Sequence, residues 1–206
     1  MNRTIIFTIL GLLVTGIAGY FLFFHQSTPE PIDLSKGPLI AFGDSLVYGV
    51  GATDGNDFVS LLSARIGIPI ENFGRSGDTT ETALARISTI TSEHPSLVII
   101  LLGGNDYLHK VPLDDTFKNL GVIVDTLQQN GATVLLIGVR GGLLRDTYEE
   151  RFAQFAKEKD VAYVPNILDG LIGDERFMSD AVHPNNAGYM KVADKVEPTL
   201  KKLLGK

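Results

Sequence analysis

The 206-residue sequence has no cysteine, no tryptophan and only four histidines. Without cysteine, the chain forms no disulfides, offers no thiolate to zinc and has no cysteine nucleophile. Positive charge is also scarce, because 18 Lys and Arg stand against 24 Asp and Glu, which gives a net charge of −6. This balance excludes the electrostatic footprint of a nucleic-acid-binding protein. The apolar content of 44% is sufficient for the core of one globular domain.

Charge is absent altogether from residues 5–24. At about 1.5 Å per residue, this run is long enough to cross a hydrocarbon core of roughly 30 Å. We therefore predict an N-terminal transmembrane helix as a membrane anchor at 1–24, an extended linker at 25–37 and a domain at 38–206. Arg3 precedes the run and acidic residues follow it, which favours a cytoplasmic N-terminus and a domain on the periplasmic or extracellular side. Secretion after cleavage of a signal peptide is the alternative.

Beyond the linker, short apolar runs alternate with amphipathic patterns. The runs predict strands near 39–42, 68–73, 97–102, 133–139 and 162–165, and the patterns predict helices near 57–66, 80–92, 114–129, 146–159 and 186–204. Such alternation is typical of a parallel sheet covered by helices on both faces. We expect an α/β fold, a three-layer α/β/α sandwich with a five-stranded parallel flavodoxin-like sheet, in a monomeric protein.

Ser45 follows the first predicted strand directly, in the string LIAFGDSLVYG. Ligands of open α/β sheets bind outside the carboxyl ends of the strands, so a serine there is a candidate nucleophile. The G-x-S-x-G elbow of α/β-hydrolases is not present, because Val47 replaces its second glycine. Neither a dinucleotide fingerprint nor a Walker lysine occurs here, so we expect no nucleotide cofactor. The alternative is that Asp44 and Ser45 are ordinary turn or N-cap residues.

A serine nucleophile needs a base, most often a histidine held by a carboxylate. Of the four histidines, His183 alone has a suitable neighbour, because Asp180 precedes it by three residues and Pro184 favours an extended conformation at His183. The others are His25 in the linker, His94 before Pro95 and His109. The alternative is that this segment only opens the last helix. No metal site is expected, because Asp180 and His183 have no further ligands at suitable spacing.

Acyl transfer also requires hydrogen-bond donors for the developing oxyanion. Gly77 and Asn105 follow the second and third predicted strands and could supply them, although both could equally be turn residues. Apolar side chains beside these loops could line a substrate site, namely Leu46, Tyr107 and Leu108 with their neighbours Val47, Tyr48, Val111 and Leu113. They could equally be buried loop anchors.

Four strings, FGDSL, NFGRSGDTT, LLGGND and DAVHPN, occur in this order. They resemble the four blocks of the SGNH or GDSL-type hydrolase family, most closely its bacterial arylesterase, lysophospholipase and acyl-thioesterase branch, and the resemblance runs from Leu39 to Leu204. It implies Ser45 as nucleophile, His183 as base and Asp180 as its orienting carboxylate. It also implies an oxyanion hole of the Ser45 and Gly77 N–H groups with the Asn105 side chain. By the same resemblance, Asp44, Asn72 and Asp78 hold the loops of the site together.

These observations together predict a serine hydrolase that cleaves small-molecule or lipid esters or thioesters through an acyl-serine intermediate, without metal or organic cofactor. Three alternatives remain open at this point: a carbohydrate O-acetylesterase on the same fold, a non-catalytic lipid- or glycan-binding module, and a nucleotide binder of the flavodoxin type.

Overall fold

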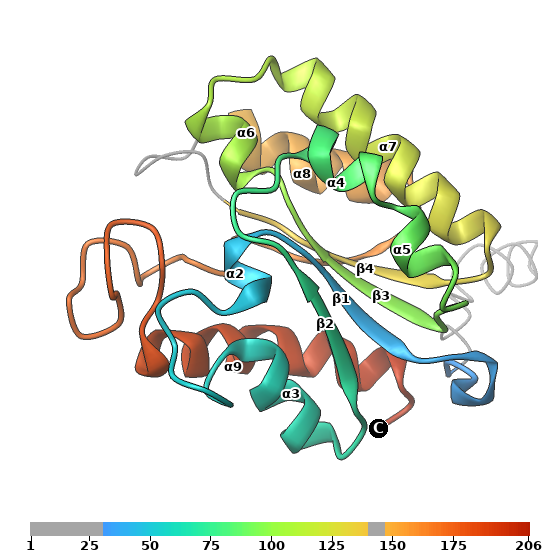
Figure 1. Cartoon of the computed structure of the whole chain (residues 1–206), viewed down its shortest axis with the longest axis horizontal. Helices are drawn as coiled ribbons and strands as arrows, with labels where there is room; N and C mark the ends of the chain where they lie inside the picture. Colours follow the sequence, from blue (N-terminus) through green and yellow to red (C-terminus); the bar gives the residue numbers. More distant parts are fainter. Residues whose placement is uncertain (1–30, 140–146) are drawn as a thin grey trace, which may run out of the picture. The chain divides into compact units, whose positions relative to one another are not determined.

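The computed structural model describes residues 31–139 and 147–206. Their central feature is a five-stranded parallel sheet with the strand order β2-β1-β3-β4-β5 (Figure 1). The strands are β1 (Leu39–Gly43), β2 (Ile70–Gly74), β3 (Leu97–Leu101), β4 (Thr133–Ile137) and β5 (Ala162–Val164). This is the flavodoxin-like order, and each predicted strand is present, so the predicted sheet is confirmed.

The register of the sheet brings the carboxyl ends of its strands to one edge. Gly43 at the end of β1 pairs with Gly74 of β2 and with Leu101 of β3, and Leu101 pairs in turn with Ile137 of β4. Every residue of β1 and β3 is buried, as expected for strands covered on both faces. The loops that follow β1, β2 and β3 therefore start side by side.

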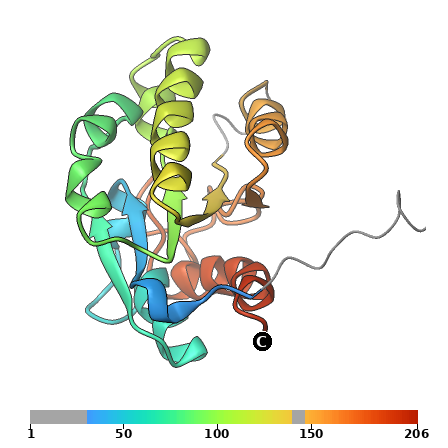
Figure 2. The ribbon, with the colours of Figure 1, turned by 90° about the vertical axis from the view of Figure 1, so that its right-hand side faces the viewer.

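Helices cover both faces of the sheet (Figure 2). One face carries α3 (Phe58–Ile66) and α9 (Asn186–Leu203), and the other carries α4 (Thr80–Ala85), α5 (Ser88–Thr91), α7 (Leu113–Gln129) and α8 (Thr147–Glu158). Two short helices, α2 (Ser45–Tyr48) and α6 (Gly104–Leu108), lie directly after β1 and β3. The three layers of the predicted sandwich are thus present.

Three local predictions were wrong. The single helix expected over 80–92 is split into α4 and α5, because the backbone leaves the helical conformation at Arg86 (φ −113°, ψ 15°). The short helices α2 and α6 fall where only loops were expected. Leu34–Lys36 form a 3-10 turn, η1, capped by the Asp33 side chain, where an extended linker was expected.

The described chain begins at the amino ends of the strands. The Ile32 N–H donates to the Leu203 carbonyl, at the end of α9. Within residues 31–139 and 147–206, no helix is long and apolar enough to cross a membrane. The apolar run 5–24, on which the predicted transmembrane helix rests, lies outside the described residues.

Candidate active site

Ser45 is the first residue of α2, at the point where β1 ends. The preceding Gly43 lies so close to β3 that a Cβ there would be 2.1 Å from the Leu101 carbonyl oxygen, so the position accepts only glycine. The Asp44 side chain caps α2 by accepting a hydrogen bond from the Leu46 N–H at 3.0 Å. Ser45 is 8% exposed and lines the cleft described below.

Asn72 fixes α2 against the neighbouring strand. Its Nδ2 donates to the Val47 carbonyl at 2.7 Å, and its Oδ1 accepts from the Gly74 N–H at 2.9 Å. A four-residue helix is too short to be stable by itself, so these contacts and the Asp44 cap supply its stability. The direction of the Ser45 side chain is therefore set by β1 and β2 together.

His183 lies between Ser45 and Asp180. Its Nε2 is 2.9 Å from the Ser45 Oγ, and its Nδ1 is 2.7 Å from the Asp180 Oδ2. The three side chains form a continuous line of hydrogen bonds, although Ser45 is separated from His183 by 138 positions in the sequence. The structure thus brings the three residues of the predicted triad together.

The segment that carries Asp180 and His183 is a tight loop before α9. The Ser179 N–H and hydroxyl both donate to the His183 carbonyl, at 2.9 and 3.0 Å. The Asp180 Oδ1 accepts from the Val182 and His183 N–H groups, each at 2.8 Å. Asn185 then caps α9 by accepting from the Gly188 N–H. Asp180 therefore fixes His183 twice, by a hydrogen bond to its backbone N–H and by one to its imidazole ring.

The Asp180 carboxyl is ionised throughout the neutral range. Its limited burial opposes ionisation, but the hydrogen bonds from the Val182 N–H, the His183 ring and the His183 N–H outweigh it and lower the pKa to about 2. An ionised Asp180 accepts a hydrogen bond from Nδ1–H and so favours the tautomer whose Nε2 is unprotonated. That nitrogen faces the Ser45 hydroxyl.

Gly77 and Asn105 both line the same cleft as Ser45 and His183. Gly77 has a φ of +84°, a left-handed conformation that glycine adopts without strain. Asn105 belongs to α6, and its Nδ2 donates one hydrogen to the Asp78 carbonyl at 2.9 Å. Because an amide nitrogen carries two hydrogens, one remains for a ligand in the cleft.

Three buried carboxyl groups lie beneath these loops, those of Asp44, Asp78 and Asp106. Asp78 pairs with Arg86, and Asp106 accepts hydrogen bonds from the Thr80 N–H and hydroxyl. Burial raises the pKa of Asp44 to about 7, against the Leu46 hydrogen bond, and the negative charges of Asp78 and Asp106 act in the same direction as burial.

The cleft has a volume of about 370 Å³ and is mainly apolar. The predicted substrate-binding residues Leu46, Tyr107 and Leu108 all line it. Sequence reasoning missed further wall residues, which follow β4 and β5: Val139, Leu168, Ile172 and Val182. Of the neighbours also considered, Val47 is buried in the core and Tyr48 is 63% exposed outside the lining, while Val111 and Leu113 line a separate groove beside Tyr107.

In the described part of the chain, no group of three or more His, Asp or Glu side chains is arranged to hold a metal ion. The cleft itself presents a hydroxyl next to an oriented imidazole, with Gly77 and Asn105 in the same lining. This combination is suited to acyl transfer.

Comparison with known proteins agrees with this geometry. The sequence profile of the GDSL-like Lipase/Acylhydrolase family matches residues 41–191. Esterase TesA of Pseudomonas aeruginosa is 30% identical over 205 residues, which cover 94% of this chain and 98% of TesA. Thioesterase 1/protease 1/lysophospholipase L1 of Escherichia coli K12 is 27% identical over 175 residues, 81% of this chain and 84% of that enzyme.

The fold is shared as well. A crystal structure of TesA superposes with a TM-score of 0.73 at 32% identity, and the match covers 81% of this chain and 99% of that one. The profile match and the TesA relative each span most of the chain. The chain therefore belongs to the GDSL-like lipase/acylhydrolase family and is a carboxylic ester hydrolase of its serine esterase and thioesterase type.

Proposed function

We propose that Ser45 is the nucleophile of this hydrolase, His183 its general base and Asp180 the carboxylate that orients His183. The observation that carries the proposal is the 2.9 Å contact between the Ser45 Oγ and the His183 Nε2, continued at 2.7 Å from Nδ1 to Asp180. We assign the oxyanion hole to the backbone N–H groups of Ser45 and Gly77 and the remaining Nδ2 hydrogen of Asn105.

The reaction proceeds in two halves. The Ser45 Oγ attacks the carbonyl carbon as its proton moves to the His183 Nε2, and the negative charge of the tetrahedral intermediate collects on the former carbonyl oxygen. The intermediate collapses when His183 gives the proton to the leaving alcohol or thiol, which leaves an acyl-Ser45 ester. A water then repeats the sequence, and the carboxylic acid is released from a regenerated Ser45.

The walls of the cleft favour an acyl or aryl group as the part of the substrate that is bound. Leu46, Val139, Leu168 and Ile172 offer aliphatic surface next to Ser45, and Tyr107 and Leu108 are partly exposed at the cleft. A lining of this kind favours the binding of a hydrocarbon group, because apolar surface is removed from water, whereas a sugar needs hydrogen-bonding partners. We therefore propose esters and thioesters of apolar acids, lysophospholipids among them, as the substrate class.

A chain-length series tests both the residues and the substrate class. The full chain in non-ionic detergent is assayed with p-nitrophenyl esters from acetate to palmitate and with matching thioesters. We expect kcat/KM to rise with acyl length until the cleft is filled, and Ser45→Ala to abolish turnover and labelling by a fluorophosphonate. Ser88→Ala on the exposed side of α5 is the matched control. Turnover that survives in Ser45→Ala would refute the assignment, and a preference for acetylated sugars would refute the substrate class.

We also propose that the domain acts outside the cytoplasm, attached to the membrane through residues 5–24. The support is the uncharged length of this run and the position of Arg3 before it. Carbonate extraction of membranes should retain the full-length protein, while Leu13→Arg, in the middle of the run, should reduce retention because an arginine there costs about 2.5–3.5 kcal/mol. A soluble product that lacks residues 1–24 by mass would establish secretion instead.

A further inference from the structure

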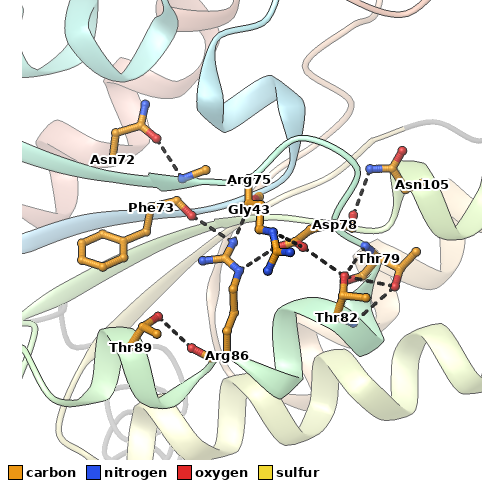
Figure 3. A network of polar contacts seen from close by, with 11 residues as sticks. Gly43, Asn72, Phe73, Arg75, Asp78, Thr79, Thr82, Arg86, Thr89 and Asn105 are labelled. Carbon is orange, nitrogen blue, oxygen red and sulfur yellow. Dashed lines mark hydrogen bonds and ion pairs between the residues drawn. The ribbon is translucent and has the colours of Figure 1, made fainter.

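The guanidinium of Arg86 lies between the ends of β1 and β2, at Gly43 and Phe73, and the Asp78 side chain (Figure 3). Its Nη2 donates to the Gly43 carbonyl at 3.1 Å and to the Phe73 carbonyl at 3.0 Å, and its Nε donates to the Asp78 Oδ2 at 2.6 Å. The Arg86 Cζ also lies 4.3 Å from the centre of the Phe42 ring. One side chain, only 16% exposed, thus joins the ends of β1 and β2 to the loop that follows β2.

Two contacts of Arg86, those with Gly43 and Asp78, lie close in the sequence to a proposed oxyanion donor. Gly43 stands two positions before Ser45, and Asp78 follows Gly77 directly. The third donor is reached through Asp78, whose carboxylate binds Arg86 and whose carbonyl accepts from the Asn105 Nδ2. The relative positions of all three donors therefore depend on where this guanidinium holds Gly43 and Asp78.

The local structure is shaped around this side chain. The helix expected over 80–92 ends at Arg86, and Asp78 in the preceding turn also accepts from the Thr82 hydroxyl. Arginine suits the position because its planar group carries several donors in fixed directions, whereas a lysine ammonium is a point charge that cannot reproduce them together.

Arg86 also places a mostly buried positive charge next to the buried acids. Asp78 is 2% exposed and pairs with Arg86, and burial and the charges of Asp78 and Asp106 raise the pKa of the nearby Asp44. Removing the guanidinium takes the close ion pair away from a buried carboxylate, which keeps only the Thr82 hydroxyl and the exposed Arg75 at 3.9 Å as partners. A weakly compensated carboxylate beside the proposed oxyanion hole opposes the negative charge that develops there. Loss of Arg86 should therefore weaken oxyanion stabilisation in two ways, by misplacing the donors and by leaving more negative charge near them.

We propose that Arg86 is a positioning residue that sets the geometry of the oxyanion hole through Gly43 and Asp78. The proposal rests on the roles proposed above for Ser45, Gly77 and Asn105. Misplacement of oxyanion donors weakens transition-state binding and leaves substrate binding largely intact. Substitution of Arg86 should therefore lower kcat and change KM little.

The first test compares Arg86→Lys and Arg86→Met with Arg65→Met in the full chain in detergent. Arg65 is the matched control, because it also binds two carboxylates, those of Asp194 and Glu197, but between α3 and α9. At a temperature well below each Tm, we expect kcat to fall about 100-fold in Arg86→Met and about tenfold in Arg86→Lys, with KM within about threefold. Arg65→Met should lower Tm only. An unchanged kcat in Arg86→Lys would overturn the proposal.

A double-mutant cycle with Asn105→Ala separates positioning from general loosening. Because Arg86 is proposed to place the Asn105 amide through Asp78, part of the Arg86→Lys penalty should disappear in a chain that already lacks this amide, which leaves a cost below about threefold. If the fold loss in kcat of the double variant equals the product of the losses in the two single variants, the proposal is overturned. The cycle uses Arg86→Lys, so it remains informative if Arg86→Met does not fold.

Fluorophosphonate labelling distinguishes this proposal from the assignment of Ser45. If the parent chain is not labelled at Ser45, the proposed function fails and the role of Arg86 fails with it. If Ser45 is labelled while Arg86→Lys keeps the parent kcat, only the role of Arg86 fails.

Discussion

Asp44 is a buried carboxyl next to the nucleophile, and replacing it by asparagine should change how stability depends on pH. Asparagine keeps the oxygen that accepts from the Leu46 N–H, so the cap of α2 is retained. It removes the group whose pKa burial raises from 3.8 to about 7. The variant therefore tests whether Asp44 is protonated in the folded protein.

The sign and size follow from the difference in pKa between the folded and unfolded chain. Because the folded pKa is the higher one, the proton stabilises the fold fully below pH 3.8, and this contribution is lost as the pH rises through 7. Between pH 5 and pH 8 the parent should lose about 2–3 kcal/mol of stability from this group alone. Asp44→Asn has no such loss, so its free energy of unfolding relative to that of the parent should rise by the same amount between pH 5 and pH 8.

Urea unfolding at pH 5 and pH 8 measures this difference. The full chain in detergent is followed by circular dichroism, because it contains no tryptophan. Asp54→Asn, which removes an exposed charge of the same sign, is the control and should shift the comparison by less than about 0.5 kcal/mol. If the difference between Asp44→Asn and the parent is the same at both pH values, Asp44 is ionised in the fold and the reasoning is wrong.

Two further predictions concern the site. Asp180→Asn preserves the oxygen that accepts from the Val182 and His183 N–H groups but presents an amide to the imidazole, which reverses the tautomer; kcat should fall about 10⁴-fold with Tm nearly unchanged. A fall of less than tenfold would show that the carboxylate does not orient His183. Asn105→Ala should lower kcat by about 10²–10³-fold in steady-state assays and leave fluorophosphonate binding to Ser45 possible; an unchanged kcat would remove Asn105 from the oxyanion hole.

The sheet could be predicted from sequence because its strands are short apolar runs. β1 and β3 are buried on both faces, so each reads as an unbroken stretch of hydrophobic residues. Ser45 could be singled out as a candidate nucleophile for a related reason, since it follows β1 and parallel strands bring their carboxyl ends to one edge. The meeting of Ser45 with His183, by contrast, depends on a loop whose path only the structure shows.

What could not be predicted depends on contacts between distant segments. The helices α2 and α6 have four and five residues, and neither has a periodicity to detect. Arg86 stands in a pattern that indicates one amphipathic helix, where a charged residue is expected to face water. Its side chain instead turns inward to bind Gly43 and Phe73, far apart in the sequence. The one hint in the sequence is that an acid, Asp78, precedes Arg86 by eight positions and could pair with it. Nothing in the sequence shows which backbone carbonyls accept the remaining hydrogen bonds of Arg86.

The entry of the chain into the domain has a practical consequence. Ile32 joins the end of α9 at the amino ends of the strands, whereas the cleft lies beyond their carboxyl ends. An attachment made directly before residue 31, whether to a bead, a fusion partner or a surface, therefore joins the domain at the end of the sheet away from Ser45. Protein attached at this end should therefore bind and turn over substrate as the free domain does.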